Sequence, residues 1–454
     1  MWGFILWYTQ YMGTSKRNNH KKKYNKRKKR RNKFRLVSVF MITLTAVVIF
    51  GLGSVLIHKQ AKKARLEAIE RAEAEYAHFK ITKEAIPEDI SGEEVAQAVE
   101  AAVEEIKQAN VKYADEIANE DYLIANNIYV KESKAESGDD VTITFAGDIL
   151  FDSSYSVMAK LKENGGEIAS GIDPALIDIM KASDIMMLNN EFPYSYGGTP
   201  TEGKTYTFRA DPSTARYLVD MDVDVVSLAN NHAYDYGEQA FLDTLSTLDG
   251  VGIPYVGAGH NINEASAPVF YIVNNTKIGI LSATQIEKGD YPDTKGATED
   301  RPGVFRCWKN KALLDKIEET KQKCDFLIVY IHWGTESTTD IDWAQQEQTP
   351  QMVNAGADLI IGDHPHVLQP ISVMNGVPIV YSLGNFWFNS KEIDTCMVQA
   401  TIGESGLKSL KFIPALQSGC RTKLLAGDEA MRVIYEMQSM SPKVSIDGNG
   451  YITF

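Results

Sequence analysis

The stretch Ala355–Pro370, AGADLIIGDHPHVLQP, holds the pattern that decides the fold. Its run DLII is typical of a buried parallel strand, and Gly362 ends that run. His364 and His366 follow at a spacing of two, at which residues of an extended segment point to the same side. Both imidazoles can therefore face one point beyond the carboxyl end of a strand, where open α/β sheets bind their ligands. The same residues would also fit a loop with two solvent-exposed histidines. The rest of the sequence is needed to choose between a ligand site and such a loop.

From Val141 onward, short apolar runs alternate with helical patterns, as in a layered α/β domain. Run after run ends in a side chain that can bind metal or phosphate. These side chains are Asp148, Glu191, Asn231 with His232, His332, and the pair His364 and His366. A structural role does not explain the acids, because Asp and Glu are seldom buried unpaired. The mixture of Asp, Glu, Asn and His predicts one or two divalent ions, of Mn, Fe or Zn rather than Ca or Mg.

The amino-terminal part has a different character. Residues 1–35 hold 13 Lys or Arg and no Asp or Glu, in a chain of net charge −13. Residues 36–57 contain no charged side chain and are long enough to span a hydrocarbon core of about 30 Å as a helix. A basic flank before a single span keeps the amino terminus in the cytoplasm. We therefore expect the lipid bilayer, and no nucleic acid, as the partner of this region.

The predicted span lacks an Ala-x-Ala cleavage site after it, which favours an uncleaved signal anchor over a cleaved signal peptide. It is followed by residues 58–140, rich in Ala, Glu and Lys, which we interpret as a helical stalk and linker. The main domain is expected over residues 141–395, and residues 396–454 are expected to complete it with further strands and a helix. The four cysteines form no CxxC motif, so disulfides and free thiols both stay open.

Six motifs lie in a fixed order within the main domain. They are residues 145–150 (FAGDIL), 190–191 (NE), 227–237 (SLANNHAYDYG), 332–336 (HWGTE), 356–369 (GADLIIGDHPHVLQ) and 381–386 (YSLGNF). This set resembles the motifs of the bacterial capsule-synthesis CapA family, known for poly-γ-glutamate synthesis proteins and related to calcineurin-like metallophosphatases. The resemblance covers residues 141–389, a little over half the chain.

The resemblance implies an α/β fold in four layers, an αββα sandwich of the metallophosphatase type. It also implies a set of metal ligands, in which Glu191 would bridge two ions. That set is Asp148, Glu191, Asn231, His332, His364 and His366. His232 would give a proton to a leaving group, with Asp235 orienting its ring. Arg209 and Asn385 would bind the substrate, Arg209 by clamping a phosphate or carboxylate with its planar guanidinium.

One position departs from the phosphatase pattern. Leu150 stands where that pattern has a histidine, two residues after the first aspartate. A leucine side chain has no donor atom for a metal. The first metal site is therefore expected to have one ligand fewer than in the phosphatases.

These features predict a membrane-anchored extracellular protein of capsule or poly-γ-glutamate biosynthesis. Its site would be a metal-dependent, phosphoesterase-like one that acts on an anionic polymer or a phosphoester, beside membrane-bound polymer synthase subunits. An alternative is a non-catalytic accessory subunit that holds a synthase or exporter complex together. A third is a general phosphoesterase unrelated to capsule. The sequence alone leaves these three open.

Overall fold

The computed structural model describes residues 111–134, 140–286 and 294–454. The predicted basic tail, the signal anchor at residues 36–57 and most of the stalk lie outside these ranges. Within them, no helix combines the length and the apolar character that crossing a membrane requires.

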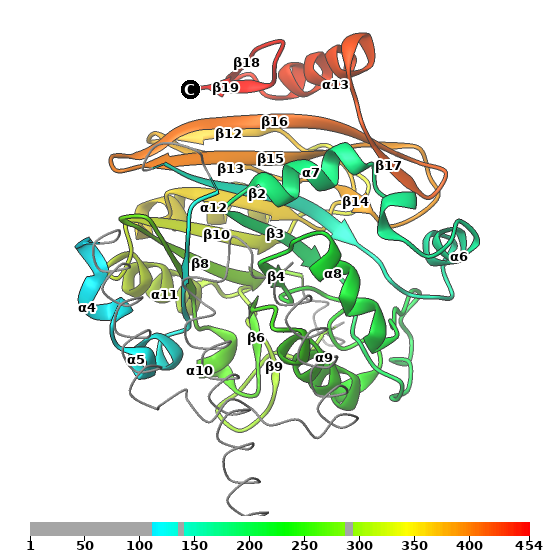
Figure 1. Ribbon diagram of the computed structural model, residues 1–454, viewed down its shortest axis with the longest axis horizontal. Helices are drawn as coiled ribbons and strands as arrows, with labels where there is room; N and C mark the ends of the chain where they lie inside the picture. The colour runs from blue at the N-terminus through cyan, green and yellow to red at the C-terminus, as the bar shows by residue number, and fades with distance from the viewer. Residues whose placement is uncertain (1–110, 135–139, 287–293) are drawn as a thin grey trace, which may run out of the picture.

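Two sheets lie at the centre of the molecule (Figure 1). The first has seven strands, and its inner strands run parallel. In spatial order they are β1 (Ile128–Lys131), β7 (Val269–Val273), β8 (Thr276–Thr284), β10 (Phe326–His332), β11 (Leu359–Asp363), β13 (Val377–Val380) and β12 (Ile371–Met374). Asn274 and Asn275 form the turn of a hairpin, the antiparallel pair β7 and β8.

The second sheet has ten strands and joins a parallel half to an antiparallel half. Its spatial order is β18 (Ser445–Ile446), β19 (Tyr451–Thr453), β16 (Gly406–Ser418), β15 (Ile393–Gly403), β2 (Val141–Ile149), β3 (Ile185–Asn190), β4 (Val225–Ser227) and β5 (Tyr255–Val256), with β14 (Asn385–Trp387) beside β2 and β17 (Arg421–Leu424) beside β16. A separate two-stranded sheet pairs β6 (Ala258–Gly259) with β9 (Gly303–Val304).

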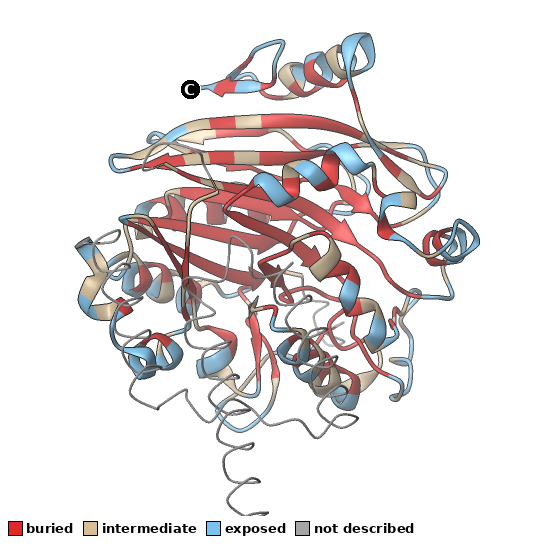
Figure 2. Cartoon of the chain, in the orientation of Figure 1, coloured by how far each residue is buried: buried red, intermediate tan, exposed pale blue. Residues whose placement is uncertain are grey.

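The two large sheets pack face to face through alternating side chains. On β2, Ile143 and Phe145 point into the core between the sheets, where they meet Ile328 and Tyr330 of β10. The residues in between point the other way, toward helices. Neighbouring residues of a strand face opposite sides, so a strand covered on both faces is buried at every position, as β10 and β11 are. Figure 2 shows this buried centre beneath helices whose outer sides are exposed.

Helices cover the outer face of both sheets. Those over the ten-stranded sheet are α6 (Ser156–Glu163), α7 (Pro174–Ala182), α8 (Arg216–Asp220) and α9 (Gly237–Val251); those over the seven-stranded sheet are α10 (Ile262–Ala265), α11 (Lys311–Lys321) and α12 (Trp343–Ala355). Asp173 caps α7, and Asp211 caps the short 3-10 turn Pro212–Ala215 before α8; in both, a proline follows in the first turn. The predicted α/β class is confirmed.

The structure differs from the expected boundary at Val141. The short helices Ala114–Ile117 (α4) and Glu120–Ala125 (α5) lead into β1, which extends the seven-stranded sheet by pairing with β7. Val130 of β1 packs against Ile272 in a small apolar cluster. Four residues, IYVK, are too few for a reliable strand signal, and only the exposed edge of β7 makes them one. Residues 111–131 therefore belong to the folded body rather than to a stalk.

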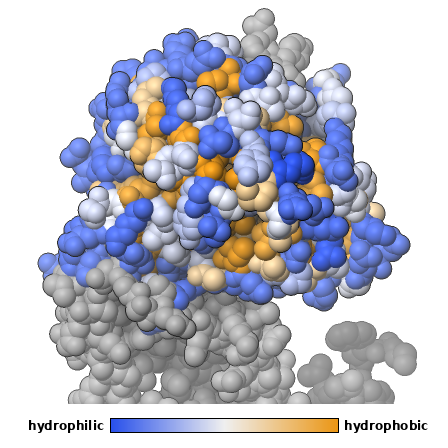
Figure 3. Space-filling model, turned by 90° about the horizontal axis from the view of Figure 1, so that it is seen from above, coloured by the Kyte–Doolittle hydropathy of each residue, from blue (hydrophilic) through white to orange (hydrophobic). Residues whose placement is uncertain are grey.

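The carboxyl-terminal part continues the ten-stranded sheet through the long hairpin of β15 and β16. The helix α13 (Gly427–Met440) then lies over this end, and its Val433, Ile434 and Met437 are buried. Figure 3 views the molecule from this side, where apolar patches lie between hydrophilic side chains. The four cysteines, all within the described residues, are free thiols.

Candidate metal centre

The predicted ligands come together where the carboxyl ends of parallel strands from both sheets meet. In the ten-stranded sheet, Asp148 lies near the end of β2, Glu191 directly follows β3, and Asn231 lies shortly after β4. The histidines follow or end β10 and β11 of the seven-stranded sheet. All six residues are buried except His366, which is partly exposed. The site therefore forms only when the two sheets pack together.

The backbone around the site is held in an unusual conformation. His364 and His366 adopt φ values of 93° and 59°, in the left-handed region that L-residues rarely occupy. Gly362 has to be glycine, because a Cβ there would lie 2.2 Å from the Tyr381 carbonyl oxygen. Gly147 is equally constrained, with a Cβ position 1.9 Å from the Gly384 oxygen. Strained residues of this kind gather at functional sites.

A first cluster joins Asp148, Glu191 and His366, whose donor atoms lie within 4.8 Å of one another. His366 Nδ1 is 3.1 Å from Asp148 Oδ2 and 3.9 Å from Glu191 Oε2. Burial by itself would raise the pKa of Asp148. The hydrogen bond and the charge of His366 outweigh it and hold this pKa below its ordinary value.

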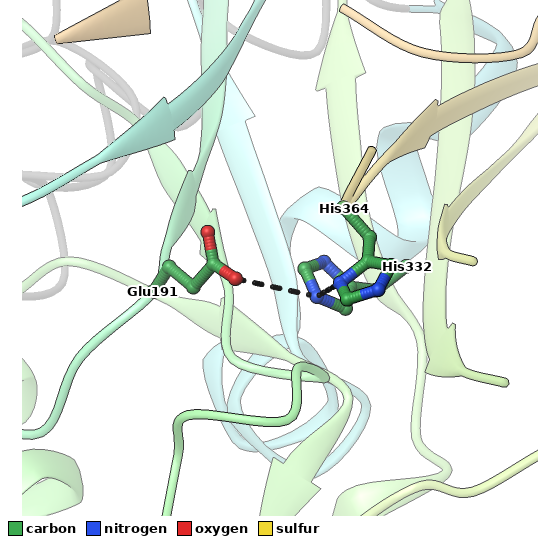
Figure 4. Close-up of side chains that lie close together, drawn as sticks. All are labelled: Glu191, His332 and His364. Carbon is green, nitrogen blue, oxygen red and sulfur yellow. Dashed lines mark hydrogen bonds and ion pairs between the residues drawn. The ribbon is translucent and has the colours of Figure 1, made fainter. Parts of the chain in front are cut away.

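A second cluster joins Glu191, His332 and His364 (Figure 4). His332 Nε2 lies 3.5 Å from Glu191 Oε1 and 3.0 Å from His364 Nδ1. Burial is the largest cause that holds the pKa of His364 well below 6.5, so this ring is neutral and can offer a lone pair. Glu191 belongs to both clusters, as a bridging carboxylate would.

His332 is held by Asp363, a residue that the sequence analysis did not single out. Its Nδ1 donates to Asp363 Oδ1 at 2.7 Å, which leaves Nε2 directed at the second cluster. Nε2 is also 2.8 Å from the amide oxygen of Asn231. A neutral His332 that donates through Nδ1 has no proton on Nε2, so two acceptors face each other there. A cation shared by both atoms would relieve this.

The Glu191 carboxylate gives the clearest test of whether a metal fits. It is fully buried, and neither of its oxygens finds a hydrogen-bond partner in the part of the chain that the structure describes. Burial, with the charges of Asp148 and Asp363, raises its pKa well above the ordinary value. Buried acids are otherwise paired or coordinate metals. Donors about 2.1 Å from one ion lie roughly 3 Å apart, and the distances given above between donor atoms of these clusters run from 3.0 to 3.9 Å. The residues therefore fit a divalent metal.

His232 lies beside the clusters in a network of its own. Its Nδ1 donates to Asp235 Oδ2 at 2.6 Å, as the resemblance implied. Asp235 also accepts from Lys204 Nζ and from the backbone N–H of Phe208. Burial raises the pKa of Asp235 to about 7, against the lowering effect of Lys204. The Phe208 ring stacks on His232, with ring centroids 4.2 Å apart.

The Arg209 guanidinium is held by neighbouring groups of the chain. Its Nη1 donates to the Gly197 carbonyl at 2.8 Å, and the guanidinium lies over the Tyr236 ring at 4.3 Å. Its role as a clamp stays a prediction. Asn385, in contrast, is buried in the site, and its Oδ1 is 2.8 Å from His366 Nδ1.

The sequence analysis missed a chain of amides behind the ligands. Asn189 donates to Asp148 Oδ1 at 2.7 Å, and Asn230 donates to Asn189 Oδ1 at 3.0 Å. The signal was present, since Asn230 stands directly before the predicted ligand Asn231 and Asn189 stands two residues before Glu191. Asp363 likewise directly precedes His364. Lys204 offered no comparable signal, because only the fold brings its loop to Asp235.

Comparisons with known proteins agree with the motifs. A family model described as "Bacterial capsule synthesis protein PGA_cap" matches residues 142–390. The "PGA biosynthesis protein CapA" of Bacillus subtilis is 32% identical over 298 residues, which cover 64% of this chain and 76% of that protein. The "Capsule biosynthesis protein CapA" of Bacillus anthracis is 28% identical over 322 residues, covering 68% and 76%.

A third relative, a "Probable polyglutamine synthesis accessory protein" of Mycobacterium tuberculosis, is 29% identical over 216 residues, which cover 45% of this chain and 55% of that protein. Among solved structures, the sulfate thiohydrolase SoxB of Thermus thermophilus matches 67% of this chain and 61% of its own chain. The identity is 11% and the TM-score is 0.37, which is too low to support a structural inference. The family match spans more than half of the chain and contains every predicted ligand. This chain therefore belongs to the bacterial capsule synthesis protein family.

Proposed function

We propose that this chain acts in poly-γ-glutamate capsule production as a membrane-anchored protein with its folded part outside the cell. We further propose that its strand-end centre is a two-ion hydrolase site of the metallophosphatase type. The names of the Bacillus relatives support the process, and residues 36–57 after a basic tail support the anchoring. The strand-end ligands support the chemistry.

One observation carries the metal-dependent part of the proposal. Glu191 is shared by two three-residue clusters, and its buried oxygens have no hydrogen-bond partner within the described ranges. A carboxylate in this position costs stability unless a cation lies on it. Asp148 and His366 would hold one ion with Glu191, and Asn231, His332 and His364 would hold the other. The mixed O and N donors favour Mn, Fe or Zn.

Two such ions, when bound, supply a polarised ester oxygen and a water of lowered pKa. The chain's own residues supply the rest. Asp235 fixes the orientation of His232 through Nδ1, so that Nε2 is the atom that exchanges protons. Lys204 lies against Asp235 and favours its carboxylate form. Phe208 stacks on the His232 ring and excludes water from this face.

The substrate class follows from this arrangement. A proton donor beside a pair of cations suits an anionic ester whose leaving group is an alkoxide. We therefore propose a phosphoester, or a similar linkage on an anionic polymer, as the substrate. Membrane-bound polymer synthase subunits are the proposed partners, since the anchor would place the site beside them.

The test uses the full-length chain in detergent, equilibrated with Mn²⁺ and assayed for hydrolysis of a dialkyl phosphodiester, whose alkoxide leaving group needs a proton. His232→Asn should lower kcat at least 100-fold, in line with the usual contribution of a general acid. Its metal content should stay equal to that of the wild type, because His232 belongs to neither cluster. The matched control is His260→Asn, which changes an exposed histidine that also pairs with an acid, Glu264.

Three results would decide against parts of the proposal. A wild-type chain that binds no Mn²⁺ would remove the metal centre. Equal kcat for His232→Asn and the wild type would remove the proton donor. Bound metal without turnover, together with unchanged polymer output from a His232→Asn strain, would favour the accessory role that the name of the mycobacterial relative indicates.

A further inference from the structure

Asn385 lies against the first cluster, at the start of strand β14. This strand pairs in parallel with β2, and Asn385 stands opposite Asp148 in the register. The backbone N–H of Asp148 donates to the Gly384 carbonyl at 3.2 Å, which ties the two segments together. The Asn385 side chain is 1% exposed, so its amide faces the interior of the site.

The amide oxygen of Asn385 lies where a side-chain donor to a metal ion would lie. It is 2.8 Å from His366 Nδ1, and the same nitrogen is 3.1 Å from Asp148 Oδ2. A single ring nitrogen carries at most one proton, so it cannot donate fully to two acceptors. Both oxygens thus lie about 3 Å from the same ring nitrogen, a separation that two donors of one bound cation also have.

The second cluster has the same construction. There the amide oxygen of Asn231 lies 2.8 Å from His332 Nε2. Each cluster thus contains the shared Glu191, a histidine, and an asparagine oxygen at the same distance from that histidine. The likeness is not local repetition in the chain, since Asn231 follows β4 and Asn385 begins β14.

Leu150 cannot serve the first cluster. Its side chain is fully buried in the apolar core beneath the helices. Its backbone N–H donates to the Trp387 carbonyl of β14 at 3.0 Å, so β14 lies along this part of β2. The strand that covers Leu150 is the one that brings in Asn385. A second strand therefore delivers the side chain that β2 itself does not provide.

We propose that Asn385 Oδ1 is the fourth protein donor to the ion held by Asp148, Glu191 and His366, and that the centre therefore takes two ions per chain. This inference rests on the proposed metal centre. It assigns Asn385 to metal binding rather than to the substrate. Loss of this donor should weaken one ion only, because the Asn385 side chain bonds to His366 and, among the described residues, no hydrogen bond joins it to His332 or His364.

The experiment measures bound Mn²⁺ per full-length chain by equilibrium dialysis, with electron paramagnetic resonance to detect coupling between two ions. The wild type should bind two ions and give a coupled spectrum. Asn385→Ala should bind one ion tightly, with the second weakened at least tenfold, and give the spectrum of an isolated ion. Asn385→Asp keeps an oxygen donor and should retain both.

Two controls accompany these variants. Asn231→Ala removes the corresponding donor of the second cluster and should also leave one tight ion. Asn164→Ala, at an exposed helix end, should bind two. If Asn385→Ala fails to fold, the comparison of Asn385→Asp with Asn385→Leu takes its place, with two tight ions expected for the first and one for the second.

The outcomes separate this inference from the proposal on which it rests. No Mn²⁺ on the wild type overturns the metal centre itself. Two ions on the wild type and two equally tight ions on Asn385→Ala overturn only the role of Asn385, which would then position His366. One ion on the wild type also overturns the inference, because the centre would not hold a pair.

Discussion

Buried acids lie at both ends of the same parallel strands, but only at the amino end does the described chain supply hydrogen-bond partners to all of them. At the amino end, Asp184 and Asp224 directly precede β3 and β4 and are almost fully buried. Asp224 forms an ion pair with Lys131 Nζ at 2.8 Å and accepts from the Met186 N–H at 2.9 Å. Asp184 accepts from the Thr142 N–H and hydroxyl at 2.7 and 2.9 Å. These acids are satisfied by the chain itself.

At the carboxyl end, Glu191 follows β3 and is equally buried. Its oxygens find no hydrogen bond in the described part of the chain, and ring nitrogens of His332 and His366 lie 3.5 and 3.9 Å from them. The fold thus neutralises a buried acid with a lysine at the amino end, where the acid serves only stability. Among the described residues no lysine forms an ion pair with Glu191, which supports the proposed binding of a cation there.

The largest expected effect comes from removing the cation at the amino end. Lys131→Met leaves the Asp224 carboxylate buried without this partner and should lower the free energy of unfolding by about 3–5 kcal/mol. The measurement is chemical denaturation of the full-length chain. Mn²⁺ binding to the folded protein should not change, since the pair lies at the opposite end of the strands from the ligands.

Lys160→Met is the control for this variant, because Lys160 pairs with Glu163 on an exposed helix surface. It should change stability by less than about 1 kcal/mol. Similar losses of unfolding free energy from both substitutions would mean that the pair of Lys131 and Asp224 does not stabilise the fold specifically. The contrast between the two ends of the strands would then fail.

The second effect is a gain in stability at the carboxyl end. Metal-free Glu191→Gln should be more stable than the metal-free wild type by about 1–3 kcal/mol at pH 8, because it removes a buried charge that lacks hydrogen bonds. The folded protein holds the Glu191 proton more tightly than the unfolded chain does, so stability falls as the pH rises above 4.5. The difference in unfolding free energy between Glu191→Gln and the wild type should therefore shrink as the pH falls toward 4.5.

With Mn²⁺ present at 100 times its dissociation constant, the order should reverse, because each ion bound to the folded wild type adds about 2.7 kcal/mol. Thermal melts with and without metal check both statements. A Glu191→Gln protein that is less stable than the wild type in the absence of metal would show that the carboxylate is satisfied after all.

The smallest effect concerns backbone strain at the site. His364 has a φ of 93°, so metal-free His364→Gly should be more stable than His364→Ala by about 1 kcal/mol. At His260, an exposed position with no positive φ, glycine should not be the more stable of the two. Denaturation of the four variants tests this, and equal values at position 364 would argue against stored strain.

Much of the site was predictable because its ligands stand at strand ends. Apolar runs followed by Asp148, Glu191, Asn231, His332 and the histidine pair predicted that these side chains would meet, and they do. Asp363 was missed because it stands between Gly362, where the predicted strand ends, and His364, and nothing in the local sequence marks it as the partner of His332. The outward hydrogen bond of Arg209 to Gly197 was not foreseeable, since it depends on how a loop folds back.

By itself, the sequence determined the α/β class, the family and the identity of most candidate ligands, because hydrophobic period and strand-end chemistry are local properties. It also determined the contrast between the charge-free run at residues 36–57 and its basic flank. The tertiary structure alone decided that β1 belongs to the sheet, that Glu191 is shared by two clusters, and that β14 brings Asn385 to Asp148. These are relations between segments far apart in the chain, and they arise only when two sheets pack face to face.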